Sequence, residues 1–251
     1  MNTYIILLAA GKGTRMNSNI PKVLHLIGCK PLIHWTIDLI KKIKPSNTVI
    51  VTGYESDKVQ KSIEEYVNDA INIAFAVQKN LKGTANAVSV GLKKIKPSSP
   101  KDTVLVLFGD DSALYEPESI KNLIKKHNTR KSKMTILTVK DKTPSPLGGL
   151  SFVEPGKVDG VLTMSQLIAN KYENIHVACG AFCFQYKWLK DNLPKIQPSP
   201  LSGEYPLPAL IKIAADQGDH AVTFSIPRSQ WNSINTQEEL AQAEGKLHAR
   251  N

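Results

Sequence analysis

Short apolar runs alternate with stretches of helical periodicity in the first part of the chain, and this alternation constrains the fold more than any other feature. Each run has the length and composition of a buried strand. The runs occupy residues 4–9, 48–52, 73–77, 103–108 and 134–139, and helices are expected at 30–44, 56–67, 83–95 and 116–127. This order predicts an α/β fold with a doubly wound, mostly parallel sheet and helices on both of its faces.

The later part of the chain departs from this order. Pro144 and Pro146 interrupt it, and a short antiparallel or mixed excursion is expected after them. The expected elements are strands at 149–153, 158–162, 175–184 and 221–226, a proline-rich loop at 190–208, and helices at 207–217 and 237–248. The last of these helices closes the chain. We expect a single domain over residues 1–251.

The charge of the chain favours an anionic partner. Lys and Arg number 32 against 22 Asp and Glu, a net charge of +10. Charge alone does not separate nucleic acid, membrane and phosphorylated small molecules. A nucleic-acid motif and an apolar run of roughly 18 to 20 residues are both lacking, so we expect neither nucleic acid nor membrane as partner. Three cysteines without a C-x-x-C pair predict a reducing, cytoplasmic setting.

A glycine-rich loop follows directly on the first expected strand. The segment reads Leu8, Ala9, Ala10, Gly11, Lys12, Gly13, Thr14, Arg15, Met16, and Lys22 comes soon after. Its two glycines allow positive φ and close approach of backbone N–H groups to a polyphosphate, while its basic residues add charge. The pattern fits neither the P-loop nor the dinucleotide-binding motif. It predicts a triphosphate cradle; a plain glycine turn with solvated basic residues is the alternative for a lone G-x-G.

The string L-A-A-G-K-G-T-R-M followed by P-K-V-L resembles the signature of sugar-1-phosphate nucleotidylyltransferases. It is most similar to the uridylyltransferase half of the bifunctional bacterial N-acetylglucosamine-1-phosphate uridylyltransferases. The resemblance continues through Gln78, Gly83-Thr84-Ala85, Phe108-Gly109-Asp110, Gly203-Glu204-Tyr205 and Ile234-Asn235-Thr236. It implies a Rossmann-like nucleotide-diphospho-sugar transferase fold with a sugar-side subregion at about 140–210. The acetyltransferase half of those proteins has no counterpart in these residues.

The resemblance also assigns roles to single residues. Asp110 and Asn235 would hold Mg²⁺, the expected cofactor, and Arg15 and Lys22 would be catalytic. The nucleotide would be bound by Leu8, Ala9, Ala10, Gly11, Lys12, Gly13, Thr14, Gln78, Gly83, Thr84 and Gly109. From the residues alone, Asp110 stands at the carboxyl end of a strand, where ligands bind in open α/β sheets, but a turn or cap aspartate fits equally. Asn235 also reads as a helix start.

The sugar side matches the family less well than the nucleotide side. Gly148, Thr163 and Ala178 lie at the family's sugar-binding positions. However, Thr163 replaces a glutamate, Ala178 replaces an asparagine, and Gly149 stands where an arginine is expected. Losing a carboxylate and an amide removes hydrogen bonds that a polar site uses for discrimination. This argues against N-acetylglucosamine 1-phosphate as the sugar substrate.

The implied reaction is attack by a sugar 1-phosphate on the α-phosphorus of UTP, which forms a UDP-sugar and pyrophosphate. The expected partners are therefore an NTP and a sugar 1-phosphate, and the oligomeric state is not predicted. Two alternatives stay open. The first is a cytidylyl- or guanylyltransferase acting on another sugar or polyol phosphate. The second is a nucleotide-binding protein that has lost sugar turnover.

Overall fold

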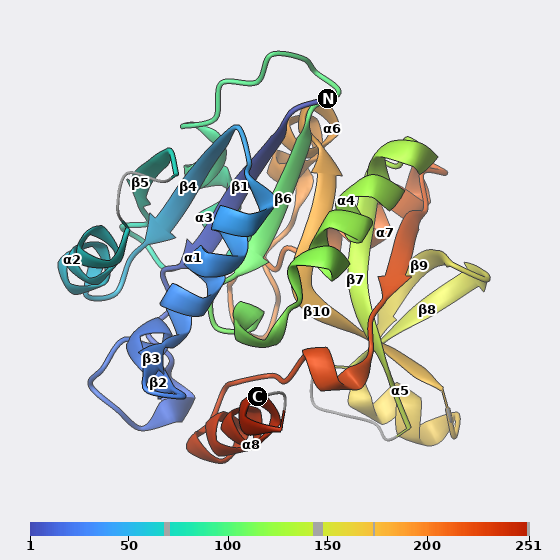
Figure 1. The fold of residues 1–251 in the computed structure, drawn as a ribbon. Helices are drawn as coiled ribbons and strands as arrows, with labels where there is room; N and C mark the ends of the chain where they lie inside the picture. The colour runs from blue at the N-terminus through green and yellow to red at the C-terminus, as the bar shows by residue number, and fades with distance from the viewer. Residues whose placement is uncertain (68–70, 143–147, 173, 250–251) are drawn as a thin grey trace.

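One large sheet organises the molecule in the computed structural model, which describes residues 1–67, 71–142, 148–172 and 174–249 (Figure 1). In these residues the sheet has nine strands in the order β5-β4-β1-β6-β10-β7-β11-β9-β8. Their bounds are β1 Thr3–Ala9, β4 Asn47–Thr52, β5 Ile73–Val77, β6 Thr103–Phe108, β7 Met134–Asp141, β8 Gly149–Glu154, β9 Lys157–Leu162, β10 Ile175–Gln185 and β11 Ala221–Ser225. A separate hairpin pairs β2 (Leu26–Ile27) with β3 (Lys30–Pro31).

The strand directions confirm the doubly wound, mostly parallel α/β fold. β1 runs parallel to β4 and β6, and β4 runs parallel to β5. β10 lies antiparallel between β6 and β7, and β11 is parallel to β7. β9 is antiparallel to both β11 and β8, which is the antiparallel excursion expected after residue 148. Within the described sheet, seven strands therefore run in one direction, and only β9 and β10 run in the opposite direction.

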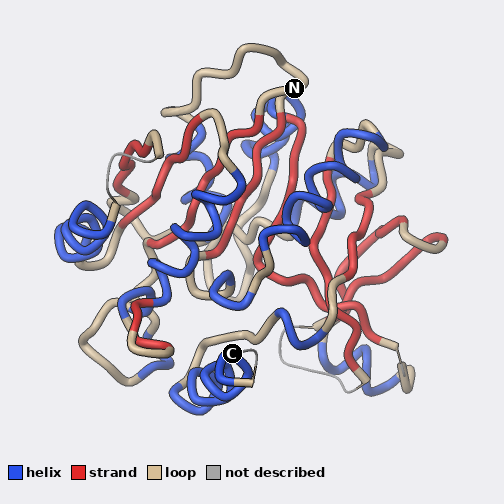
Figure 2. The backbone as a smooth tube through the Cα atoms, in the orientation of Figure 1, coloured by secondary structure: helices blue, strands red, loops and turns tan. Residues whose placement is uncertain are grey.

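Helices cover both faces of the sheet, as Figures 1 and 2 show. Their bounds are α1 Leu32–Ile43, α2 Ser56–Tyr66, α3 Thr84–Leu92, α4 Pro117–Arg130, α5 Met164–Ala169, α6 Tyr186–Asn192, α7 Ala209–Asp216 and α8 Gln237–His248. α3, α6 and α7 pack in one core, and α1, α2 and α4 pack in the other. No helix in the described part of the chain combines the length and the apolar character that crossing a membrane requires.

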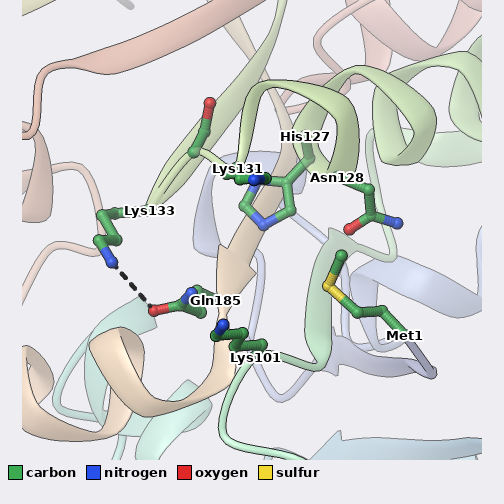
Figure 3. A pocket seen from close by; sticks show the side chains of 8 residues that line it. Met1, Lys101, His127, Asn128, Lys131, Lys133 and Gln185 are labelled. Atoms are coloured by element: carbon green, nitrogen blue, oxygen red, sulfur yellow. Dashed lines mark hydrogen bonds between the residues drawn. The ribbon is translucent and has the colours of Figure 1, made fainter.

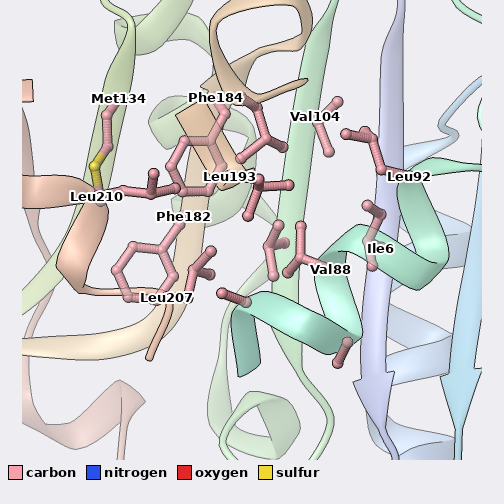
Figure 4. Packing of buried hydrophobic residues seen from close by; sticks show 14 of the residues in the cluster. Ile6, Val88, Leu92, Val104, Met134, Phe182, Phe184, Leu193, Leu207 and Leu210 are labelled. Carbon is pink, nitrogen blue, oxygen red and sulfur yellow. The ribbon is translucent and has the colours of Figure 1, made fainter. Parts of the chain in front are cut away.

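The two cores explain why the first strand reads as a continuous apolar run. Ile6 and Leu8 of β1 enter one core, whereas Ile5 and Leu7 enter the other, so β1 has no polar face. Figure 4 shows the first core, where side chains of α3 lie beside Ile6 and where aromatic rings of β10 pack. A third, smaller cluster joins Leu247 of α8 to the hairpin and to the start of α1.

Local structure differs from expectation at several points, of which the following are the clearest. The loop expected at 190–208 is wrong at its start: α6 extends to Asn192 and a short 3-10 turn follows, because Trp188 and Leu189 are buried in the core. α1 begins at Leu32 rather than at residue 30, since Lys30–Pro31 pairs in the hairpin. α5 was not expected. The break expected at Pro144 and Pro146 lies outside the described residues.

Candidate active site

The carboxyl ends of β1, β4 and β6 lie at one edge of the sheet, with α8 and the β2–β3 hairpin beyond them (Figure 1). Gly109, after β6, donates its backbone N–H to Leu8 O at 2.9 Å. Tyr54, after β4, donates to Ala10 O at 3.0 Å. The end of β1 is therefore fixed between its two neighbours, and the expected phosphate loop begins where open α/β sheets bind ligands.

The two loop glycines have different structural roles. Gly13 precedes the 3-10 turn Thr14–Met16 with φ +68°, a conformation that favours glycine. A Cβ at Gly13 would also lie 2.6 Å from Lys22 Cβ, because the lysine stem passes over it. Gly11 does not use the positive φ that glycine allows, and no heavy atom outside its two chain neighbours lies within 4 Å of its Cβ position. The loop is thus open around Gly11, where Lys12 and Arg15 are exposed.

Replacing Gly13 tests this packing. We expect Gly13→Ala to destabilise the fold by about 1–2 kcal/mol from the left-handed backbone, with a further loss from the contact with Lys22. Gly11→Ala, which meets no neighbour, is the matched control for stability. Thermal or urea unfolding of both variants measures the difference. Equal unfolding midpoints for the two variants would show that the observed loop conformation is not the one in solution.

Lys22 joins three distant parts of the sequence. Its side chain is only 9% exposed, and its ammonium forms an ion pair with Asp110. The same ammonium donates to Asn235 Oδ1 at 3.0 Å, and Arg15 Nη2 donates to that oxygen at 2.9 Å. The structure thus brings together the two basic residues and the two oxygen ligands that the resemblance assigned to catalysis and to metal binding.

The donor set at this point fits Mg²⁺. Asp110 and Asn235 both accept hydrogen bonds from the Lys22 ammonium, so one cation can lie within reach of both oxygens. Mg²⁺ takes oxygen ligands and is usually held by one or two protein carboxylates together with substrate phosphates and water. Among the described residues, no group of three or more His, Cys, Asp or Glu could hold a metal ion. Two oxygen ligands from the protein suit a metal whose remaining ligands are substrate phosphates and water.

Asn235 lies directly before α8. It can therefore stand at a helix start and also be a metal ligand, the two interpretations that the sequence offered. Thr236 is the N-cap of the helix, and its hydroxyl accepts from Glu239 N at 3.2 Å. Gln237 in the first turn donates to Met16 O at 3.1 Å, which fastens α8 to the phosphate loop. The helix start thereby places Asn235 against Lys22 and Arg15.

Asp111, next to Asp110, lies in the turn that follows β6. Its backbone N–H donates to Phe108 O at 3.2 Å. Gly180 of β10 packs against its side chain, and a Cβ there would lie 2.8 Å from Asp111 Oδ2. Burial, and next the Asp110 carboxylate, raise the pKa of Asp111 to about 8. The protein therefore places a second carboxyl group beside Asp110 in a less solvated position.

Three of the residues expected to bind the nucleotide, Gln78, Gly83 and Thr84, lie close together around the start of α3. Gln78 N donates to Thr52 O at 2.8 Å, and Thr52 pairs with Ala9, which places Gln78 at the same sheet edge as the phosphate loop. Its side chain is 4% exposed, and Nε2 donates to Gly83 O at 3.1 Å and to Asn86 Oδ1 at 2.8 Å. The sequence analysis gave no sign of Asn86 as a partner of Gln78.

Two further contacts fix this turn. Gly83 has φ +89°, and a Cβ there would lie 2.9 Å from the backbone nitrogen of Tyr205. The Thr84 hydroxyl accepts from Leu207 N at 2.8 Å. Tyr205 ends the Gly-Glu-Tyr string and Leu207 follows it, so both partners lie more than a hundred residues along the chain. The contacts explain why small and hydroxyl side chains occur at these two positions.

The expected sugar-side residues lie just before β8 (Gly148), between β9 and α5 (Thr163) and on β10 (Ala178). Gly148 has φ +73°, and its Cβ position lies 3.9 Å from Thr163 Cα. The Thr163 hydroxyl caps α5 by accepting from Gln166 N at 3.3 Å. Ala178 lies on β10 opposite Thr138, two residues before the glycine that packs on Asp111. Gly148 and Thr163 are therefore neighbours, whereas no contact of Ala178 with either of them is described.

Comparison with known proteins agrees with this geometry. A family model for nucleotidyl transferases matches residues 4–250. The chain belongs to the nucleotidyl transferase family. This nucleotidyltransferase is 32% identical over 253 residues to the bifunctional protein GlmU of Clostridioides difficile (strain 630), covering 100% of this chain and 52% of that protein. The GlmU of Clostridium novyi (strain NT) is 29% identical over 245 residues, 98% of this chain and 52% of that protein.

The nucleotidyltransferase thus spans about half the length of these curated relatives. A crystal structure of UDP-glucose pyrophosphorylase complexed with UDP-glucose superposes with a TM-score of 0.78 over 100% of both chains, at 17% identity. Similarity at this level shows the fold alone. The expected family and fold are both confirmed.

A cavity of about 370 Å³ lies at the opposite end of the sheet. Figure 3 shows the side chains that line it. Lys101, which precedes β6, and Gln185, which ends β10, form part of its lining. Asp110 follows the other end of β6, so the cavity is separate from the candidate site of the nucleotidyltransferase. His127 of α4 lies in its wall, and its Nδ1 is 2.9 Å from Thr135 Oγ1.

Burial lowers the pKa of His127 from 6.5 to about 4. The unfolded chain therefore binds a proton at a higher pH than the folded chain does, and stability falls as the pH is lowered through this window. The expected contribution of His127 is a loss of about 2 kcal/mol between about pH 7.5 and about pH 5. His127→Gln removes it. Denaturant unfolding across pH measures this loss, with the exposed His248→Gln as control; parallel profiles for His127→Gln and the wild type would contradict the expectation.

Proposed function

We propose that this nucleotidyltransferase joins UTP and a sugar 1-phosphate, with Mg²⁺, to give a UDP-sugar and pyrophosphate. The observation that supports the proposal best is the meeting of Lys22, Arg15, Asp110 and Asn235 beside an open glycine loop. Two cations and two oxygen ligands at one sheet edge suit a reaction in which phosphate groups carry all the reacting charge.

The chain's residues would mainly bring two anions together. A phosphate monoester has a second pKa of about 6 and is largely dianionic at neutral pH, so the nucleophile needs no general base. Lys22 would hold the transferred α-phosphate, while Lys12 and Arg15 would hold the β- and γ-phosphates and stabilise the leaving pyrophosphate. Bound Mg²⁺, held by Asp110 and Asn235, would add positive charge shared by the nucleophile and the α-phosphate.

The orientation of Gln78 supports UTP over CTP. Its Nε2 faces two acceptors, Gly83 O and Asn86 Oδ1, and this leaves the carboxamide oxygen to accept a hydrogen bond from the base. Uracil presents a ring N–H donor at N3, whereas cytosine presents an acceptor there. We therefore expect the enzyme to prefer UTP.

The sugar side supports a substrate other than N-acetylglucosamine 1-phosphate. A Cβ at Gly149 would lie 2.7 Å from Ile175 Cγ2, so the arginine of the family pattern does not fit without movement. The cap of α5 also engages the hydroxyl of Thr163. A sugar bound here would meet fewer charged and amide groups than the family pattern provides, which favours one without the acetamido group.

Pyrophosphate release across four NTPs and a panel of sugar 1-phosphates, each with Mg²⁺, tests the proposal. We expect turnover with UTP and a hexose 1-phosphate. Turnover with CTP or GTP on another phosphate would favour the first alternative. Tight UTP binding without turnover on a broad panel would favour a nucleotide-binding protein, which the departures at Gly149 and Thr163 motivate.

A further inference from the structure

We infer that Glu239 is a positioning residue of the metal site, which holds Asn235 in place for Mg²⁺. The inference rests on the proposed function, because that function makes Asn235 a metal ligand. Glu239 lies in the first turn of α8, and nothing in the sequence motifs pointed to it.

The polar groups of Glu239 bond to the segment that carries Asn235. Its Oε2 accepts from Asn235 N at 2.5 Å, and its Oε1 accepts from Ser233 Oγ at 3.1 Å. Its backbone carbonyl accepts from Asn232 Nδ2 at 3.0 Å, and its backbone N–H donates to Thr236 Oγ1. Among the ion pairs of the described residues, none includes Glu239. Both carboxylate oxygens of Glu239 therefore accept hydrogen bonds from residues 233–235.

This arrangement differs from an ordinary capping box. In a capping box the third helical residue bonds back to the N–H of the N-cap itself. The start of α5 has that form, since Gln166 Oε1 accepts from the N–H of the N-cap Thr163 at 2.8 Å. In α8 the N-cap is Thr236, yet the Glu239 carboxylate bonds one residue earlier, to Asn235. The Glu239 carboxylate thus hydrogen-bonds to the proposed metal ligand Asn235 instead of to the N-cap residue Thr236.

The hydrogen bond from Asn235 N to the Glu239 carboxylate holds the backbone of Asn235, and with it the position from which the Asn235 side chain extends. Asn235 Oδ1 already meets Lys22 and Arg15, so a small backbone shift would move this oxygen away from Asp110. Hydrogen-bonded partners of metal ligands orient them, and their loss typically weakens metal affinity by about 10- to 100-fold. An ionised carboxylate is also a stronger acceptor than a neutral one. Glu239 thus acts on the metal through Asn235.

Mg²⁺ dependence of turnover provides the first test. We expect Glu239→Ala to raise the half-saturating Mg²⁺ concentration at least about tenfold, with a smaller change in turnover at saturating Mg²⁺. Glu239→Gln should recover most of the loss, because its amide oxygen can accept from Asn235 N. Glu238→Ala, an exposed neighbour in the same turn, is the matched control and should leave the Mg²⁺ dependence unchanged.

Mn²⁺ binding gives a readout that does not need turnover. Titration of Mn²⁺ in the presence of UTP, followed by electron paramagnetic resonance, should show weaker binding to Glu239→Ala than to the wild type. In an Asn235→Ala background, Glu239→Ala should add no further loss. This double variant separates action through Asn235 from a general effect on α8. If Glu239→Ala does not fold, Glu239→Asp carries the test, because its shorter side chain keeps the charge but should not reach Asn235 N.

The outcomes separate the inference from the proposed function. Equal Mn²⁺ binding by the wild type and Glu239→Ala, or additive losses in the Asn235→Ala background, would overturn the inference even if the enzyme turns over UTP. Weakened Mn²⁺ binding by Glu239→Ala in a protein without turnover on any sugar phosphate would support the inference and reject the proposed function.

Discussion

Asp110→Asn should lower pyrophosphate release from UTP and the preferred sugar 1-phosphate by about a thousandfold, equal to roughly 4 kcal/mol of transition-state stabilisation. Asparagine keeps the size of the side chain and can still accept from Lys22. It removes the only carboxylate charge proposed to hold Mg²⁺. The loss should therefore appear in turnover and in Mg²⁺ dependence, with the fold preserved. Steady-state kinetics at saturating UTP and Mg²⁺ measures it.

Glu118→Gln is a suitable control because it removes one exposed carboxylate in the first turn of α4. It should leave turnover unchanged. Unfolding curves of both variants would show that the loss in Asp110→Asn is not a loss of folded protein. Wild-type turnover by Asp110→Asn at saturating Mg²⁺ would contradict the assignment of Asp110 as a metal ligand.

Arg15→Ala should reduce turnover by about 10²- to 10³-fold, the effect of removing one charged donor aimed at developing charge. The Arg15 side chain is exposed, and its one assigned contact within the site is the bond to Asn235 Oδ1, so the fold should tolerate the change. Because Arg15 would stabilise leaving pyrophosphate, the reverse reaction, pyrophosphorolysis, should fall by a similar factor. Rates in both directions test this.

Arg15→Lys keeps the charge but loses the planar fork that bonds two phosphate oxygens, so it should recover only part of the rate. Arg130→Ala, an exposed arginine in the last turn of α4, is the control for lost charge and should behave as the wild type. A rise in the KM for UTP with unchanged kcat would show that Arg15 binds UTP equally in the ground and transition states, against the role proposed for it.

The elements with strong local patterns could be predicted from the sequence. β5 and β6 lie at the expected residues, and α8 has its expected bounds. The two strands are short apolar runs, and α8 begins at a recognisable N-cap residue, Thr236. α6 could not be predicted in this way, because prolines from residue 194 onward extend the loop signal back to residue 190, whereas the burial of Trp188 and Leu189 stabilises a helix that ends at Asn192.

In the candidate site too, local features could be predicted from the sequence, whereas contacts between distant segments could not. The phosphate loop is continuous in the sequence, so its composition shows its chemistry. The partnership of Lys22 with Asn235 depends on how α8 packs, and so do the contacts of Glu239. The burial of Gln78 depends on Asn86 and on the turn at Gly83. Local composition carries no information on such pairings, and only the family resemblance pointed to Gln78 and Asn235.

Single turnover with labelled UTP would show which phosphorus atom is attacked. One sample carries the label at the α-phosphate and the other at the γ-phosphate, each mixed with enzyme, Mg²⁺ and the preferred sugar 1-phosphate. We expect the α-label to move to the UDP-sugar and the γ-label to leave in pyrophosphate, and both transfers should be about a thousandfold slower in Asp110→Asn. Release of the γ-label as orthophosphate, or UTP binding with no α-label on any sugar of a broad panel, would contradict nucleotidyl transfer at this site.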